Sequence, residues 1–208
     1  MRLVAWFSLL LLAPACLAAS LARAGIPSAS TSTVPARLFL CPAGDSVFVV
    51  IPRHLSMNAW AEGDVWVDLC DCPAVVLSRA GARGYTVDAA GCVATAAPLP
   101  DATYRFPLAG SGVCPGGWAR TYAEGVLLAQ RTTVVSPDQN GDLRVDRTDV
   151  AIVRSKLGTP DPVADLDGDG VVTEADVALV AAHLGHASPE GQTPTQPATW
   201  GSLKLRYR

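Results

Sequence analysis

The sequence of 208 residues contains none of the short motifs that mark the common classes of enzyme active site. It has no Gly-x-Ser-x-Gly, no His-Glu-x-x-His and no phosphate-binding loop. His54 has no Ser or Cys nucleophile motif beside it. Acids outside the segment 138–176 are few, which disfavours the paired carboxylates that glycoside hydrolysis requires. We therefore expect that the protein is not an enzyme.

Long apolar runs are absent after the first two dozen residues, and a transmembrane helix needs roughly 20 such residues. Residues 3–12 are apolar, Arg2 precedes them, and residues 22–24 (Ala-Arg-Ala) form a small-x-small cleavage site. This pattern predicts a signal peptide over residues 1–24 and a secreted or cell-surface chain without a transmembrane segment. Lipidation of Cys16 is the alternative, although the residues before it lack the usual large aliphatic side chain.

Cysteine is scarce, and the mature chain keeps five: Cys41, Cys70, Cys72, Cys92 and Cys114. In an exported protein these residues favour disulfides over metal binding. Cys70 and Cys72 are also too close together for a zinc knuckle. Because five is an odd number, one thiol is left over or pairs with another chain. The spacing leaves the pairing open.

The dominant feature of the sequence is an acid-rich repeat with two copies. The first copy covers residues 138–158 (DQNGDLRVDRTDVAIVRSKLG) and the second covers residues 165–185 (DLDGDGVVTEADVALVAAHLG). The whole chain has a net charge of −3, but ten acids oppose four bases between Asp138 and Asp176. Acids at such fixed spacing are costly without a cation, and they argue against nucleic acid as a partner.

Both copies match a 12-residue calcium loop, which supplies oxygen ligands from positions 1, 3, 5, 7, 9 and 12. The ligands predicted in the first loop are Asp138, Asn140, Asp142, Arg144 through its backbone carbonyl, Asp146 and Asp149. Those predicted in the second loop are Asp165, Asp167, Asp169, Val171 through its backbone carbonyl, Thr173 and Asp176. Magnesium demands a tighter octahedral geometry, so we predict two Ca²⁺ ions.

Two further loop positions bear on the geometry. Position 6 needs a sharp turn, which suits Gly170 in the second loop, whereas Leu143 predicts a strained or altered path in the first. Position 8 is apolar in both copies, and we expect Val145 and Val172 to pair across the loops and anchor them to a core.

A helix is predicted after each loop, because apolar residues follow at i, i+3 and i+7. They are Val150, Val153 and Leu157 in the first copy and Val177, Val180 and Leu184 in the second. Gly158 and Gly185 are natural helix ends. No helix is predicted before the first loop, because residues 132–137 are β-branched and end in proline. His183 and His186 favour a surface role near the end of the second helix, with a metal site as the alternative.

Two half EF-hands about 27 residues apart, each a loop and a helix ending in Leu-Gly, resemble a type I dockerin. The resemblance implies antiparallel packing of the two units, calcium-dependent folding and a cohesin-like partner. It also implies the partner-binding residues Arg147, Thr148, Arg154, Ser155, Glu174, Ala175, Ala181 and Ala182. The two copies differ at these positions, and at loop positions 10 and 11 Thr148 alone keeps the usual hydroxyl.

Residues 37–135 have a different sequence pattern, in which short β-branched or alternating runs are separated by Gly, Pro and Asp. The predicted strands lie in residues 46–51, 64–69, 92–96, 104–108, 118–123 and 126–135. This spacing predicts an antiparallel β-sandwich. The segment resembles the immunoglobulin-like modules that precede calcium repeats in bacterial secreted proteins. The motifs that carry this resemblance are residues 41–45 (CPAGD), 88–91 (DAAG) and 122–128 (YAEGVLL).

The predicted fold class is therefore multidomain, an all-β immunoglobulin-like sandwich followed by a small all-α dockerin-like module. The predicted boundaries are 1–24 (signal peptide), 25–36 (linker), 37–135 (sandwich), 136–186 (dockerin-like module) and 187–208 (Pro-rich linker with a basic, aromatic tail). We expect a non-catalytic calcium-binding protein that docks to a cohesin-like partner. The alternative is a carbohydrate-binding accessory of a polysaccharide-degrading system, with Trp60, Trp66 and Trp118 as a sugar-stacking face.

Calcium added to chelated protein should raise its helix content, because both predicted helices begin inside the calcium loops. Far-ultraviolet circular dichroism during a calcium titration measures this rise. A helix signal that is already complete in chelator and does not change with calcium would contradict the prediction.

Overall fold

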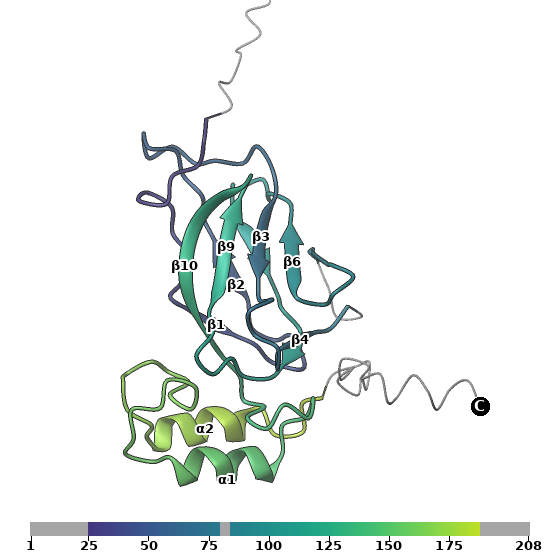
Figure 1. Cartoon of the computed structure of the whole chain (residues 1–208), viewed down its shortest axis with the longest axis vertical. Helices are drawn as coiled ribbons and strands as arrows, with labels where there is room; N and C mark the ends of the chain where they lie inside the picture. The colour runs from purple at the N-terminus through teal and green to yellow at the C-terminus, as the bar shows by residue number, and fades with distance from the viewer. Residues whose placement is uncertain (1–24, 80–83, 188–208) are drawn as a thin grey trace, which may run out of the picture.

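The computed structural model describes residues 25–79 and 84–187, with strands first and two helices last (Figure 1). The strands are β1 (Arg37–Phe39), β2 (Phe48–Val50), β3 (Val65–Asp68), β4 (Val76–Leu77), β5 (Thr86–Val87), β6 (Val93–Ala96), β7 (Tyr104–Phe106), β8 (Gly110–Ser111), β9 (Ala119–Ala123) and β10 (Val126–Val135). The helices are α1 (Arg147–Ser155) and α2 (Glu174–Ala182). The β-rich region and the helix pair lie end to end in the figure.

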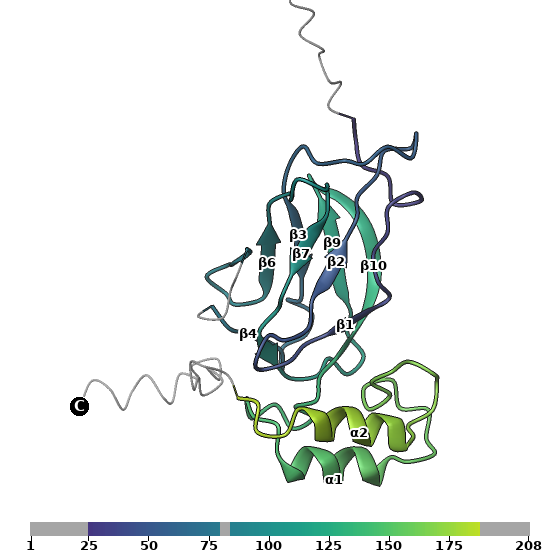
Figure 2. The same cartoon turned by 180° about the vertical axis from the view of Figure 1, so that it is seen from behind.

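Six strands form a curled sheet in the order β1-β10-β9-β3-β6-β5. All its neighbouring strands are antiparallel except β1 and β10, which run parallel. Two short ribbons, β2–β7 and β4–β8, accompany the sheet (Figure 2). The parallel pair corrects the expectation of a purely antiparallel arrangement. The first strand, β1, lies at the edge of the sheet beside the last strand, β10, and runs in the same direction, so this pair is parallel.

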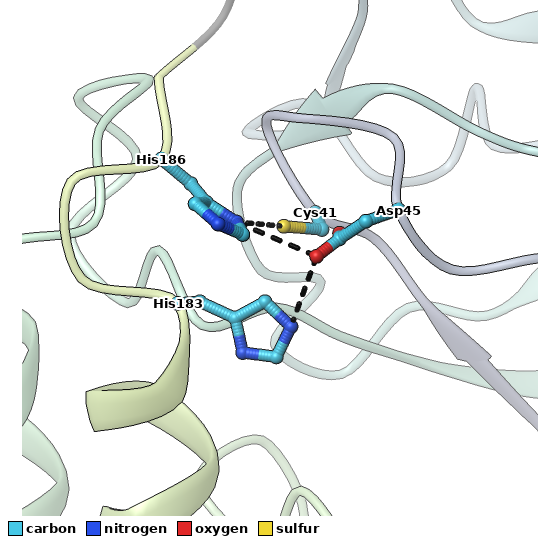
Figure 3. A group of neighbouring side chains, drawn as sticks. All are labelled: Cys41, Asp45, His183 and His186. Atoms are coloured by element: carbon cyan, nitrogen blue, oxygen red, sulfur yellow. Dashed lines mark hydrogen bonds and ion pairs between the residues drawn. The ribbon is translucent and has the colours of Figure 1, made fainter.

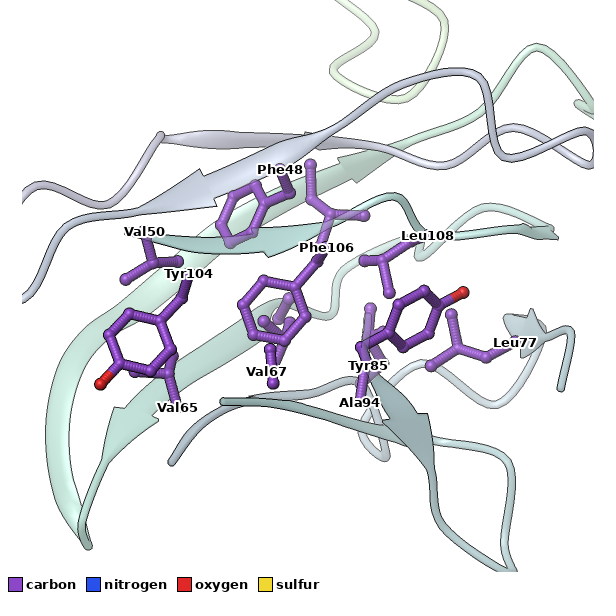
Figure 4. Packing of buried hydrophobic residues seen from close by; sticks show 14 of the residues in the cluster. Phe48, Val50, Val65, Val67, Leu77, Tyr85, Ala94, Tyr104, Phe106 and Leu108 are labelled. Carbon is purple, nitrogen blue, oxygen red and sulfur yellow. The ribbon is translucent and has the colours of Figure 1, made fainter. Parts of the chain in front are cut away.

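The core lies between the six-stranded sheet and the β2–β7 ribbon (Figure 4). Phe48 and Phe106 point from the ribbon toward Val65, Val67 and Ala94 of the sheet. Along β3 the buried valines alternate with half-buried residues, as the sequence pattern predicts for a strand with one face in the core. These contacts make one continuous apolar cluster.

Each of the six predicted runs contains a strand, and the turn between β9 and β10 lies where expected. Glu124 and Gly125 have φ values of 45° and 81°, so both adopt the left-handed conformation of a tight hairpin turn. The strands β1, β4, β5 and β8 were not predicted. They contain only two or three residues each, too few to show a period of two. The immunoglobulin-like assignment stays a prediction.

The segment expected to be a linker, residues 25–36, lies against the loop that follows β2. Thr33 exchanges two backbone hydrogen bonds of 2.9 Å with Ile51, and the Trp60 indole donates a 2.9 Å bond to the Gly25 carbonyl. Residues 1–24 and 188–208, where the signal peptide and the basic tail were predicted, lie outside the described residues. No helix in the described ranges is long and apolar enough to cross a membrane.

Two disulfides join the loop after β3 to the segments before β6 and after β8, which confirms the prediction that the cysteines form disulfides. They are Cys70–Cys92 and Cys72–Cys114. Cys41 is buried and has no disulfide partner among the described residues. It is therefore the leftover thiol that the odd count implied, and its burial disfavours pairing with another chain.

Candidate functional site

The first residue of each calcium loop holds the loop backbone together in the same way. Asp138 accepts hydrogen bonds from the backbone N–H groups of Gly141 (2.8 Å) and Leu143 (2.9 Å). Asp165 accepts the equivalent bonds from Gly168 (2.7 Å) and Gly170 (3.0 Å). The repeat seen in the sequence is therefore also a repeat of hydrogen-bond geometry.

The last residue of each loop closes it from the other side. Asp149 accepts backbone N–H bonds from Gln139 (2.8 Å), Asn140 (3.2 Å) and Asp146 (2.8 Å), and Asp176 accepts the corresponding three in the second loop. A carboxylate offers about four lone-pair directions, so three of them are already used. These bonds compete with the bidentate closure that the loop pattern predicts at position 12.

The second loop brings three predicted ligands together. Carboxylate oxygens of Asp165, Asp167 and Asp169 all lie within 4.8 Å of one another. Oxygens bound to one calcium ion at 2.3–2.6 Å can be at most about 5 Å apart, so this spacing fits a shared ion. In the first loop, Asn140 and Asp142 take the corresponding places, and the Asn140 carbonyl oxygen accepts a 3.0 Å bond from the Asp142 N–H.

Position 9, a predicted calcium ligand, is also the N-cap of the following helix in both copies. The Asp146 carboxylate accepts the Thr148 N–H, and the Thr173 hydroxyl accepts the Ala175 N–H. Asp146 keeps a second oxygen for an ion, whereas Thr173 has only its hydroxyl. We expect Thr173 to act through a bridging water, as position 9 often does. The backbone carbonyls of Arg144 and Val171 stay predicted ligands.

Leu143 shows how the first loop accommodates an unfavourable residue at position 6. It adopts φ 71°, close in kind to the φ 98° of Gly170, so the first loop follows the same path as the second. The left-handed conformation costs a branched or long residue about 1–2 kcal/mol. The Leu143 side chain is only 6% exposed, and burying it contributes about 1.5–3 kcal/mol. Burial therefore offsets the strain.

Val145 and Val172 lie in one apolar core, as expected, but their backbones pair with other residues. Val145 donates a 2.9 Å bond to His186 and accepts one from Gly185, while Val172 bonds Gly158 and Thr159. Each loop thus pairs with the residues that follow the other helix, which requires α1 and α2 to run antiparallel. Both valines are 1% exposed and share one apolar cluster with residues of the two helices.

The apolar stripe of each helix is shorter than predicted. Val153, Val177 and Val180 are buried in the cluster, but Leu157 and Leu184 are 39% and 46% exposed. The helices end at Ser155 and Ala182, so the chain turns before either leucine completes the stripe. Gly158 and Gly185 follow with positive φ, as expected for residues that end a helix.

Buried carboxylates are the main electrostatic feature of the loops. Asp138, Asp149 and Asp176 are fully buried, and Asp165 is 3% exposed. Burial raises the pKa of Asp138 to about 6, and burial also raises the pKa of Asp149. Both shifts arise because a buried charge is costly without a compensating partner. A divalent cation bound by these oxygens supplies that compensation.

Arg37 is a site residue that the sequence patterns did not reveal. It lies in β1 and forms an ion pair of 3.2 Å with the Asp165 carboxylate, and it also donates to the Asp165 carbonyl. A Cβ at Gly168 would clash with its guanidinium, so the arginine lies directly against the second loop. An arginine at a strand start has no sequence signature, and only the tertiary contact identifies it.

All eight predicted partner-binding residues are exposed. Four lie on α1 or its start, and four lie on the equivalent part of α2: Arg147, Thr148, Arg154, Ser155, Glu174, Ala175, Ala181 and Ala182. Within each helix the two pairs are seven residues apart, which is about two turns. Each helix therefore presents one continuous exposed face.

Each calcium loop is followed by a single helix and pairs with the residues that follow the other helix. This arrangement defines a docking module built from two half EF-hands. Residues 136–185 match the family model of the dockerin type I domain, and this segment is a type I dockerin at the C-terminal side of a β-rich region. The predicted resemblance is thus confirmed. Dockerin domains bind calcium, dock to cohesin domains and typically belong to extracellular or cell-surface proteins. No curated protein and no solved structure matches the chain.

Asp165→Ala should lower the melting temperature in saturating calcium more than Asp138→Ala. Both changes remove position 1 of a loop, but only Asp165 also pairs with Arg37 and belongs to the loop with glycine at position 6. Losing the ion pair leaves a partly buried guanidinium without its carboxylate. Thermal melts followed by circular dichroism compare the two variants, and equal or reversed losses would refute the ranking.

Proposed function

We propose that this is an exported, non-catalytic protein that binds two Ca²⁺ ions and docks to a cohesin-like domain through its dockerin. The β-rich region is then the part displayed on the partner. The observation that carries the proposal is the pair of exposed helix faces on a calcium-loop scaffold of repeated geometry. The disulfides support export, because such bonds persist in oxidising compartments.

The two helix faces differ in charge, which favours one binding orientation. The α1 face carries Arg147 and Arg154 with two hydroxyl residues, Thr148 and Ser155. The α2 face carries three alanines and one acid, Glu174. Arginine is enriched among the residues that dominate interface energies, and it binds carboxylates with two parallel hydrogen bonds. We infer that α1 meets an acidic surface of the cohesin-like partner.

The absence of catalysis is supported by the surroundings of the polar residues in the β-rich region. A hollow of about 510 Å³ contains His54, Ser56 and Glu62 among its lining residues. Ser56 accepts a hydrogen bond from Asn58, and within residues 25–79 and 84–187 no hydrogen bond joins the Ser56 and His54 side chains. The buried thiol of Cys41 is a poor nucleophile, because burial and the neighbouring Asp45 raise its pKa to about 12.

The second candidate function is carbohydrate binding by the outer face of the curled sheet. Trp66 stacks on Tyr122 at a ring distance of 5.6 Å, and Trp118 is 40% exposed. Trp60 cannot contribute to such a face, because it is 1% exposed, stacks on Tyr104 and belongs to the core. The sugar-stacking face expected from the sequence is therefore reduced to two tryptophans and a tyrosine.

Reversing the charge of the α1 face should weaken docking without unfolding the domain. Full-length protein is tested against purified type I cohesin domains in calcium and in chelator, by calorimetry. The double variant Arg147→Glu/Arg154→Glu should bind at least about tenfold more weakly, because two exposed arginines are lost and two like charges face the partner. Circular dichroism in calcium verifies that the variant keeps its helices.

The matched control is Glu174→Arg/Ala181→Glu, which changes the equivalent positions of α2. It should leave affinity nearly unchanged. A greater loss in the control than in the α1 variant would refute the assignment of the face. A failure of the unaltered protein to bind any cohesin in calcium would refute the proposed partner class.

The carbohydrate alternative is tested by retention of the protein on insoluble polysaccharides. If the sheet face binds sugars, Trp66→Ala/Trp118→Ala should release the protein, because stacking area is lost. Leu127→Ala, another exposed apolar residue at 37% exposure, is the control for nonspecific adhesion. Equal retention of both variants would count against carbohydrate binding.

A further inference from the structure

Four side chains with metal-binding atoms converge between the β-rich region and the dockerin (Figure 3). Cys41 and Asp45 come from the loop between β1 and β2, and His183 and His186 come from the end of α2 and the turn after it. One donor atom from each lies within 4.8 Å of all the others. Neither calcium loop contributes to this group, which we call the junction cluster.

The backbone holds both halves of the junction cluster in place. Gly44 donates a 3.0 Å bond to the Cys41 carbonyl and has φ 67°, so a tight turn sets Cys41 beside Asp45. The Cys41 carbonyl also accepts a 3.1 Å bond from Gly110. On the other side, the carbonyl of His186 accepts the 2.9 Å bond from Val145. The backbone on each side of the junction cluster is thus held by its own hydrogen bonds, at Cys41 on one side and at His186 on the other.

The two carboxylate–imidazole distances in the junction cluster are longer than direct hydrogen bonds, and all three distances match the spacing of ligands around one ion. Cys41 Sγ lies 3.4 Å from His186 Nδ1, and the Asp45 carboxylate lies 3.5 Å from His183 Nε2 and 3.5 Å from His186 Nδ1. Ligands around a tetrahedral zinc ion, at about 2.0–2.3 Å from it, are separated by about 3.3–3.6 Å. A charge-assisted hydrogen bond between nitrogen and oxygen would measure about 2.7–2.9 Å.

The orientation of His183 supports the same interpretation. Its Nδ1 lies 2.7 Å from the Leu179 carbonyl oxygen, so Nδ1 carries a proton and donates it there. Nε2 then faces the Asp45 carboxylate, so either a proton on Nε2 or a cation between the two groups is needed to make this contact attractive. Histidines that bind metals commonly donate their other ring N–H to a carbonyl in this way.

The donor types select the metal. One sulfur, two imidazole nitrogens and one carboxylate oxygen suit zinc, whereas calcium takes oxygen ligands alone. A thiolate and a carboxylate also balance the charge of a divalent ion at a place where Cys41 is fully buried. We propose that Cys41, Asp45, His183 and His186 form a four-coordinate zinc site that joins the dockerin to the β-rich region.

Binding is a ligand exchange that balances without any redox step. The zinc ion gives up its water ligands, the Cys41 S–H proton passes to solvent, and a Zn–S bond forms. Four protein ligands leave no open position, which is typical of a structural site. The site connects the loop after β1 to the end of α2, so its effect is to fix the dockerin on the β-rich region.

The test uses the full chain in saturating calcium, so that the calcium loops remain filled, after treatment with a zinc-selective chelator. Co²⁺ serves as the probe, because its tetrahedral complexes absorb strongly in the visible range and its thiolate complexes show a charge-transfer band. We expect one equivalent of Co²⁺ to give both signals and zinc to displace it. Cys41→Ser should remove the charge-transfer band, and Asp45→Asn and His183→Ala should weaken zinc binding at least about tenfold.

The matched control is His54→Ala, a histidine outside the junction cluster, which should bind Co²⁺ as the unaltered protein does. Circular dichroism in calcium checks that each variant keeps its helices, and the conservative Asp45→Asn keeps the test valid if another variant misfolds. Co²⁺ spectra without a thiolate band, or spectra unchanged by Cys41→Ser, would overturn the proposal. Cohesin binding is measured separately in calcium, so either proposal can fail without the other.

Discussion

The structure of the dockerin depends on carboxylates that are buried at both ends of each calcium loop. Asp138 and Asp149 in the first loop, and Asp165 and Asp176 in the second, organise the backbone by accepting its N–H groups. The same burial makes their negative charge costly. Backbone order and cation binding are thus consequences of one arrangement, since the groups that shape the loop are also those that require the ion.

The dockerin packs against the β-rich region, because the two β1 residues on either side of the buried Leu38 contact it. Arg37 pairs with Asp165, and Phe39 packs against the apolar cluster of the dockerin and against the His183 ring at 5.3 Å. β1 is itself paired with β10, the strand that leads into the first loop. The parallel edge of the sheet therefore places β1 and the end of β10 together at the junction with the dockerin.

The local patterns of the sequence predicted the dockerin and its two helices, whereas the long-range contacts could not be read from them. A fixed spacing of acids identifies loop residues such as Asp165, because the chemistry of the ion dictates that spacing. The strand β3 was visible through its alternation, whereas two-residue strands carry no period. Arg37 and the partners of Val145 could not be predicted, because each is defined by residues far away in the chain.

The pairing of Val145 with Gly185 and His186 imposes an order of events on the chain. The first loop reaches its final backbone pairing only when the last turn of the domain is present, about 40 residues later in the sequence. A chain that emerges from its N-terminus, during synthesis or translocation, cannot complete the first loop before the second. A chain truncated before Gly185 therefore lacks the backbone partners of Val145, even though the whole first loop is present.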